Sequence, residues 1–302
     1  MKNFWKPLRS VIMTLLKEPK AVIGLIIFFI FILITIFAPL LATHDPEQPI
    51  AVPFQAPSAQ YWLGTTGYGQ DVYSQLMYGI SASMVIGLEV AVITTVLAVI
   101  IGIYAGYAGG WIDAVLNWIT NVFLVFPAYP LMLVIASYLP NSGNFIIVLV
   151  IAFTSWAPQA RVMRAQAQTF KRRDFSLAAK MTGMSTMGIV LKEIVPNIIS
   201  LIFNTFIVTM QWGIYAEAFI RFLGVGSIAT PTLGNMLNSA QNGEALLNGG
   251  WWWFVPPGVA IMLITLALTL INYGVDTISN PRLQKPPKLP QEWRKKLGLQ
   301  TR

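Results

Sequence analysis

The chain has 302 residues, of which 55% are hydrophobic and only 11% are charged, against about 25% charged in a typical soluble domain. This deficit argues against a soluble protein, and the long apolar runs indicate a polytopic membrane protein. The runs lack the alternation of a transmembrane β-barrel, so they predict helices. The absence of cysteine excludes disulfides and thiolate metal sites. The net charge of +8 is no sign of nucleic acid, because the basic residues flank the apolar runs.

The first long apolar run covers residues 21–41, after a basic segment of residues 1–20. The run is longer than the core of a signal peptide, about 7–15 residues, and no small-residue cleavage site is obvious, so we expect an uncleaved transmembrane helix. Residues 42–81 are expected to form an outer loop, and its polar, proline-rich part, residues 43–75, predicts little regular structure. A short helix over residues 74–83 would lead into the next span. His44, the single histidine, is interpreted as a solvated loop residue.

Five further apolar runs predict a core of five more transmembrane helices within residues 82–280. We expect these spans at residues 82–107, 112–139, 144–164, 188–219 and 251–273. Pro127 and Pro130 are predicted to kink or break the third span, and Pro196 interrupts the fifth. Residues 221–250, rich in glycine, proline and amides, predict a second outer loop.

Three glycines spaced by four share one helix face near the end of the second span: Gly102, Gly106 and Gly110. Small residues at this spacing let a neighbouring helix approach closely. They are therefore candidate helix-packing positions. The alternative, that they merely loosen the end of the span, remains open at this level.

The distribution of basic residues predicts the orientation of the chain in the cell membrane. Six spans put both termini on one side. Nineteen of the 20 Lys and Arg residues fall on that side, within residues 1–20, residues 161–192 and the tail of residues 281–302. Basic residues mark cytoplasmic segments, so we expect both termini in the cytoplasm. Arg221, at the outer end of the fifth span, is the exception.

A short polar segment, residues 174–185, lies between the fourth and fifth spans. It has enough helix formers for about two to three turns, whereas a span needs about 20 apolar residues. The segment is therefore expected to lie on the cytoplasmic side, where it is able to meet another protein.

The sequence lacks the motifs of the common enzyme classes. It contains no phosphate-binding loop of the form G-x-x-x-x-G-K-[ST], no H-E-x-x-H zinc motif and no G-x-S-x-G serine motif. We therefore expect no enzyme activity, no metal site and no cofactor in this chain. Work against a gradient would need a partner or an ion gradient. Glu89 and Glu217 are the acids within the spans, and they are thin evidence for an ion relay.

Several motifs follow one another in a fixed order along the chain. They are YWLGT at residues 61–65, GQDVYS at 69–74, EAFIRFLGVG at 217–226, TLGNML at 232–237 and WWWFVPPG at 251–258. With them the chain resembles the permease subunits of binding-protein-dependent ABC importers, in the dipeptide, oligopeptide and nickel group. It is similar to the second of the two paired permeases in that group. The resemblance implies a type I ABC importer permease fold with six transmembrane helices.

Residues 177–183 (LAAKMTG), followed by Ile194-Val195-Pro196, resemble the family's permease signature E-A-A-x-x-x-G with its later proline. The resemblance implies that this segment is a coupling helix, which sits in a groove of an ATPase subunit. The implied contact residues are Phe175, Leu177, Ala178, Ala179, Met181 and Gly183. The chain departs from the family at Leu177, where glutamate is usual, at Gln70 and Gln75, where arginine is usual, and at Arg221, where a small residue is usual.

The resemblance further implies that the chain forms half of a translocation pathway for peptides. Its partners would be a homologous second permease, two ATPase subunits that bind ATP and Mg, an extracellular binding protein and membrane lipid. Import of oligosaccharides or nickel by the same machine is an alternative. An ion-coupled transporter acting alone and a membrane scaffold are alternatives of other classes. The polar candidates for the pathway are Asn204, Thr205, Thr209, Gln211 and Glu217, for which interhelical hydrogen bonding is an equal alternative.

Overall fold

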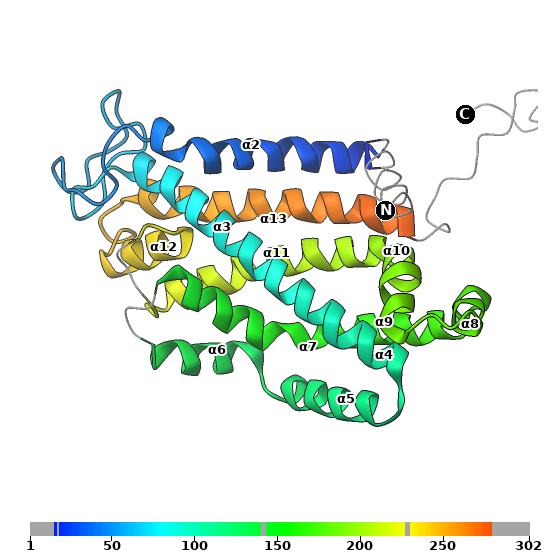
Figure 1. The fold of residues 1–302 in the computed structure, drawn as a ribbon. Coiled ribbons are helices and arrows are strands. Elements are labelled where there is room, and N and C mark those ends of the chain that lie inside the picture. Colours follow the sequence, from blue (N-terminus) through cyan, green and yellow to red (C-terminus); the bar gives the residue numbers. More distant parts are fainter. Residues whose placement is uncertain (1–14, 17, 140–142, 227–229, 280–302) are drawn as a thin grey trace, which may run out of the picture.

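The computed structural model describes residues 15–16, 18–139, 143–226 and 230–279. Five of its helical stretches are long and apolar enough to cross a membrane, and a bent helix pair would make a sixth. The chain is therefore a multi-pass, all-helical membrane protein (Figure 1). The spanning stretches are α2 (Pro19–Leu41), α3 (Val72–Ala98) continued by η1 (Val99–Ile103) and α4 (Tyr104–Ala108), the pair α5 (Gly110–Val125) and α6 (Ala128–Ser137), α7 (Asn144–Lys171), α11 (Ile199–Phe222) and α13 (Trp251–Ser279).

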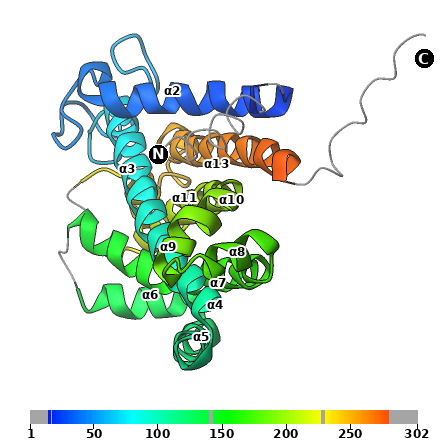
Figure 2. The same ribbon diagram turned by 45° about the vertical axis from the view of Figure 1, so that its right-hand side comes forward.

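The helix α3 is the centre of the bundle. It contacts α2, α7, α11, α12 and α13, and it crosses over α11 and α7 as a long diagonal in Figures 1 and 2. Asp71 caps its N-terminus by accepting a hydrogen bond from the Ser74 N–H at 3.0 Å. This cap satisfies a backbone donor that has no partner within the helix. The cap explains why the helix begins sharply after the proline-rich loop.

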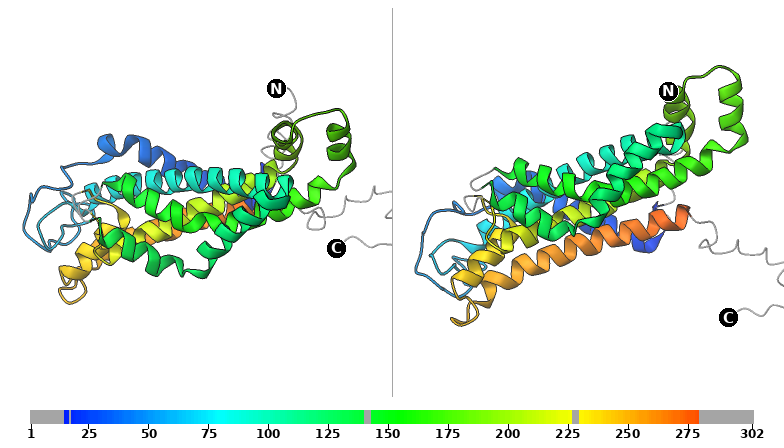
Figure 3. Two further views of the ribbon diagram at one scale, coloured as in Figure 1. Left: turned by 60° about the horizontal axis from the view of Figure 1, so that its bottom comes forward. Right: turned by 90° about the horizontal axis from the view of Figure 1, so that it is seen from below.

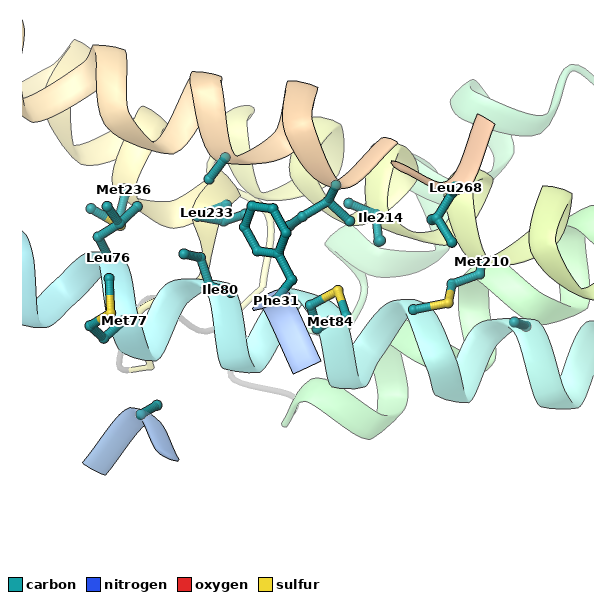
Figure 4. Packing of buried hydrophobic residues seen from close by; sticks show 14 of the residues in the cluster. Phe31, Leu76, Met77, Ile80, Met84, Met210, Ile214, Leu233, Met236 and Leu268 are labelled. Carbon is teal, nitrogen blue, oxygen red and sulfur yellow. The ribbon is translucent and has the colours of Figure 1, made fainter. Parts of the chain in front are cut away.

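Apolar side chains from distant parts of the sequence meet beside α3 (Figure 4). Phe31 of α2 packs in one buried cluster with Met84 of α3, Ile214 of α11 and Leu268 of α13. Van der Waals packing of this kind is a main source of helix association in a bilayer, where the lipid is as apolar as the side chains. The cluster therefore joins the first span to the core helices.

Two of the three spaced glycines bring η1 and α4 against α7. A Cβ atom at Gly106 would come within 2.5 Å of the Arg164 carbonyl oxygen, and one at Gly102 would collide with the Ala160 carbonyl oxygen. Gly110 differs from the expectation of helix packing, because no atom lies within 4 Å of a Cβ placed there. Its φ of 58° instead lets the chain reverse between α4 and α5.

The helix pair α5–α6 is bent by 84°, as the proline pattern predicts. The break falls at Phe126, which has extended backbone angles, and at Pro127, which precedes the first residue of α6. A residue before proline is pushed out of the helical region, which explains the position of the break. Pro130 lies in the first turn of α6, where its missing N–H removes no helical hydrogen bond.

Several expected boundaries are wrong. The short helix expected over residues 74–83 is confirmed as the beginning of α3, but α3 starts at Val72, after the Asp71 cap, and continues into the second span without a break. The fourth span continues beyond residue 164, and α7 ends at Lys171. The second outer loop, residues 221–250, contains α12 (Leu233–Asn242), which Thr232 caps through the Asn235 N–H.

The fifth span is shorter than expected, because α11 begins only at Ile199. The preceding residues form a short helical segment of three consecutive parts, α9 (Thr186–Ile189), η2 (Val190–Ile194) and α10 (Val195–Asn197). Pro196 and the non-helical Ile198 separate this segment from α11. The predictions for residues 1–14 and 281–302 lie outside the described residues.

The two ends of the bundle carry different structures. The loop before α3 and the helix α12 lie at one end, called here the α12 end (Figures 1 and 3). A hairpin of α8 (Asp174–Met181) and α9 projects from the other, called the α8 end. The structure thus separates the polar loop segments from the predicted coupling segment by the full length of the spans.

Replacement of Gly106 tests the close contact between α4 and α7. We expect Gly106→Ala to destabilise the protein by about 1–3 kcal/mol, because the added methyl group collides with backbone. Thermal unfolding in detergent measures the change. Gly143→Ala is the matched control, since its φ is −61° and no atom lies within 4 Å of the added methyl group. Equal unfolding temperatures for both variants would contradict the contact.

Candidate functional site

The short helix α8 is held by its first turn. The Ser176 hydroxyl is buried and lies 3.4 Å from the Tyr107 hydroxyl of α4. The Phe175 ring is half-buried and lies 6.0 Å from the Phe170 ring of α7. Phe175 therefore packs within this chain rather than projecting from it. Ala179 is also half-buried, against the apolar cluster between α4, α7 and η2.

The opposite side of α8 is apolar and exposed. Met181 is 89% exposed and Leu177, one turn earlier on the same face, is 49% exposed. Ala178 beside them is exposed as well. These residues are called here the α8 face. Exposed apolar residues on a helix that projects beyond the spans are candidates for contact with another protein.

The turn after α8 depends on Gly183. Its φ of 79° is in the left-handed region, and its N–H donates to the Lys180 carbonyl at 3.1 Å. The Met184 N–H reaches back to the Ala179 carbonyl at 3.2 Å. Glycine is the usual residue at such a helix end, because it lacks the Cβ that penalises this conformation. Gly183 thus ends the helix and starts the return toward α9.

The base of the hairpin is tied to the spans by polar contacts. Arg164 of α7 donates to both carboxylate oxygens of Asp113 on α5, at 2.6 and 2.8 Å. Arg161, one turn earlier, donates to Asn121 at 2.7 Å. Two-pronged arginine–carboxylate pairs fix geometry as well as charge. These contacts join α5 to the helix that carries the hairpin.

The five polar candidates for the pathway separate into two groups. Asn204 donates to Asn272 of α13 at 2.8 Å, and Gln211 donates to Thr269 of α13 at 3.2 Å. Asn204 and Gln211 are half-exposed, so they form a polar strip between α11 and α13 that other molecules are able to reach. We call these four residues the amide strip.

The other candidates are buried inside the chain. Thr209 lies 3.3 Å from Thr95 of α3 and donates to the Thr205 carbonyl at 2.8 Å. Thr205 and Thr209 are each 2% exposed. The contact of Thr209 with Thr95 agrees with interhelical hydrogen bonding, the alternative interpretation. The pathway expectation for these two residues does not agree with their position.

Glu217 belongs to a buried polar cluster at the α12 end. Its carboxylate accepts a hydrogen bond from Ser83 at 3.0 Å and lies 4.0 Å from the Arg221 guanidinium. Arg221 also donates to Asn144, the first residue of α7, at 2.6 Å. Both charged side chains are 0% exposed. The cluster therefore holds α3, α7 and α11 together, so Glu217 is not a pathway surface in this chain.

The pairing of Arg221 with Glu217 was not predicted from the sequence, in which Arg221 stood out as an exception to the charge rule and as a departure from the family. The signal was available, because Glu217 and Arg221 are four residues apart and therefore neighbours on one helix face. Two glycines make room for the arginine. Cβ atoms at Gly226 and Gly234 would come within 2.8 Å and 2.7 Å of its side chain.

His44 and Glu89 line a cavity of about 960 Å³ at the α12 end. His44 is not simply solvated, because it lies 3.6 Å from the Asp71 carboxylate and its ring is 5.7 Å from that of Tyr61. Glu89 is half-exposed on the cavity wall. No cluster of three metal-ligating side chains occurs among the described residues.

Gln70 and Gln75, which stand where the resembled family has arginine, bind each other. The Gln75 amide donates to the Gln70 side chain at 2.9 Å and to the Pro46 carbonyl at 3.0 Å. Gln70 donates to the Glu47 carbonyl at 2.8 Å. The two glutamines therefore fasten the loop before α3 to the start of that helix.

The fold is that of a multi-pass, all-helical membrane protein. Residues 98–285 match the family described as "Binding-protein-dependent transport system inner membrane component". Residues 6–60 match the "N-terminal TM domain of oligopeptide transport permease C". The chain therefore belongs to the family of inner membrane components of binding-protein-dependent transport systems, which are permease subunits of ABC transporters.

Curated relatives extend over nearly the whole chain. A dipeptide transport system permease protein of Alkalihalophilus pseudofirmus is 31% identical over 92% of this chain and 91% of the relative. One of Bacillus subtilis is 31% identical over 89% and 84%. An oligopeptide transport system permease protein of Mycobacterium tuberculosis is 30% identical over 93% and 97%.

Replacement of Arg221 tests the buried cluster. We expect Arg221→Gln to lower the free energy of unfolding by about 3–5 kcal/mol, because it leaves the Glu217 carboxylate buried without its cation. The double variant Glu217→Gln with Arg221→Gln should lose less of the free energy of unfolding, since neither buried charge remains. Thermal unfolding in detergent measures both, with Arg172→Gln at an exposed position as the control. An unchanged Arg221→Gln protein would contradict the structural role of the pair.

Proposed function

We propose that this chain is the permease subunit of an ATP-driven importer of peptides, and that it forms one half of the translocation pathway. The observation that carries the peptide assignment is the recurrence of dipeptide and oligopeptide permeases among relatives that match the chain over nearly its full length. The half-exposed amides of the amide strip support it, because side-chain amides both donate to and accept from a peptide backbone.

We propose that the α8 face binds a partner ATPase and that the chain itself hydrolyses no ATP. The partner subunits would bind ATP and Mg, since this sequence has no phosphate-binding loop. Leu177 extends the apolar surface of Met181 and Ala178. Leu177 stands where the family signature has a glutamate. The part of the ATPase groove that faces Leu177 is therefore expected to be apolar. Ala178 is small enough for close approach, while Phe175 and Ala179 position the helix from behind.

The proposed assembly contains a homologous second permease, two ATPases and an extracellular binding protein. The α8 end lies in the cytoplasm together with both termini, and the α12 end faces the outside of the cell membrane. Counting spans along the sequence assigns 19 of the 20 basic residues to the same side of the membrane as α8. Basic residues favour the cytoplasmic side, which supports this orientation. The amide strip would face the second permease across the pathway.

In the proposed cycle, the binding protein delivers substrate at the α12 end. ATP binding closes the two ATPases, which draws the two α8 hairpins together and opens the pathway to the outside. The hairpin transmits this change only if the ATPase contacts it differently in its two states. A rigid base is required for that transmission, and the Arg164–Asp113 pair provides it.

Reconstitution of the complete assembly in proteoliposomes tests the proposal. With the binding protein and ATP, we expect uptake of labelled di- and oligopeptides, and none of oligosaccharides or Ni²⁺. Uptake by this chain alone, driven by a proton or sodium gradient and lost in Glu89→Gln, would establish the rival ion-coupled transporter. ATP-driven uptake of an oligosaccharide or Ni²⁺ alone would overturn the peptide assignment but leave the ABC assignment intact.

A charge at Gly183 tests the role of the hairpin. We expect Gly183→Asp to reduce peptide uptake and ATPase co-purification by about tenfold, or ~1.4 kcal/mol of binding, because a carboxylate enters the apolar contact. Gly249→Asp is the matched control for co-purification. Gly249 has a φ of 71° and, like Gly183, no atom within 4 Å of an added Cβ, but it lies at the α12 end. Full ATPase binding and uptake by Gly183→Asp would refute the coupling role.

A further inference from the structure

A cavity of about 1180 Å³ opens at the α8 end beside the α8 hairpin, and Leu177 of the α8 face is among its lining residues. Its walls come from the turn between α4 and α5, the last turns of α7, and α8 with α9. Four basic residues line it: Lys171, Arg172, Arg173 and Lys180. They come from one short stretch of sequence, but α7 and α8 place them around a common space.

The charge of this cavity is not balanced by the part of the chain that the structure describes. Asp113 is the one acid among its lining residues, and both of its carboxylate oxygens are already bound by Arg164. The ion pairs of the described residues include none of the four lining cations. Lys171 makes only neutral contacts, 3.4 Å from the Ala108 carbonyl and 5.8 Å from the centre of the Tyr107 ring.

Neutral donors face the same space. The hydroxyls of Tyr107 and Ser176 line the cavity as a pair, at 7% and 1% exposure of the two residues. The hydrogen bond between the two hydroxyls uses one of their two protons, so the other proton remains available for donation to an acceptor. The first turn of α5 begins at this cavity without a side-chain cap, and uncapped backbone N–H groups at a helix start favour anions.

The cavity lies at the level of the membrane surface. The chain reverses direction at Gly109 and Gly110, where one spanning stretch ends and the next begins. Trp111, directly after this turn, is 75% exposed. Tryptophan is enriched where the bilayer meets water, at the level of the lipid headgroups. A lipid headgroup is therefore the anion nearest to the mouth of the cavity.

We propose that this cavity binds the phosphate headgroup of an anionic phospholipid, held by Lys171, Arg172, Arg173 and Lys180 with the Ser176–Tyr107 hydroxyl pair. Basic pockets between transmembrane helices recognise such headgroups in general. The bound lipid touches α4, α7 and α8 at once, so it braces the base of the hairpin. In the proposed orientation it comes from the cytoplasmic leaflet, and the stability of the α8 hairpin depends on the anionic lipid content of that leaflet.

Lipid binding to the purified full-length chain tests this site and needs neither ATPase nor substrate. The chain in neutral detergent is titrated with phosphatidylglycerol or phosphatidylcholine, and bound lipid is counted by native mass spectrometry. We expect one phosphatidylglycerol to bind at least about tenfold more tightly than phosphatidylcholine. Arg173→Gln with Lys180→Gln should remove that preference, and Arg173→Lys with Lys180→Arg should keep it.

The matched control is Lys20→Gln with Lys192→Gln, which removes the same charge from two exposed residues outside the cavity. An equal loss of binding in this control would show general surface attraction and overturn the site. Full displacement of the lipid by inorganic phosphate would also overturn it, in favour of a soluble anion. The single variant Lys180→Gln, at an exposed position, carries the test if the double variant unfolds. Its retention of the full preference would then refute the proposal.

Discussion

A backbone that crosses lipid must satisfy its own hydrogen bonds, and this constraint decides where the helices of this protein are allowed to break. The bend between α5 and α6 follows Phe126 and Pro127, and the turns α9, η2 and α10 stand before α11 at the α8 end. The π-helical turn η1 lies inside a spanning stretch, but it packs against α7, and Gly102 is buried at that contact. The breaks at η1 and before α11 thus occur where protein covers them or where a span ends, whereas the α5–α6 break is open in this chain, with Val125 82% and Phe126 54% exposed.

Charge inside the bundle follows the same logic. The Glu217 carboxylate and the Arg221 guanidinium have no exposed surface, and the bundle tolerates them because each has polar partners from another helix. Their partners, Ser83 and Asn144, come from α3 and α7. A polar pair that would be costly alone therefore becomes a specific junction of helices at the α12 end. Because the buried charges need these particular partners, they fix the position of α11 relative to α3 and α7.

Function, on this view, depends on how the bundle presents a short helix. The α8 face projects apolar side chains because Ser176 and Phe175 hold the other side of the helix on α4 and α7. The Arg164–Asp113 pair makes the base stiff. The basic residues that lie close together in the sequence, from α7 to α8, point to different places in the structure. Some line the cavity beside α8, whereas Arg161 binds Asn121 outside it.

The sequence by itself determined the helical membrane class, the approximate position of the spans, the break at Pro127 and the likeness to a permease family. These follow from local properties, namely run length, proline chemistry and motif order. Tertiary structure alone decided which side chains share a site. Thr205 and Thr209 of α11 are buried, and Thr209 meets Thr95 of α3, whereas Asn204 and Gln211 stay accessible, because only the packing of α11 on its neighbours distinguishes its faces. Gly24 lies against the Ala267 carbonyl of α13, a contact across the chain that no local spacing indicates.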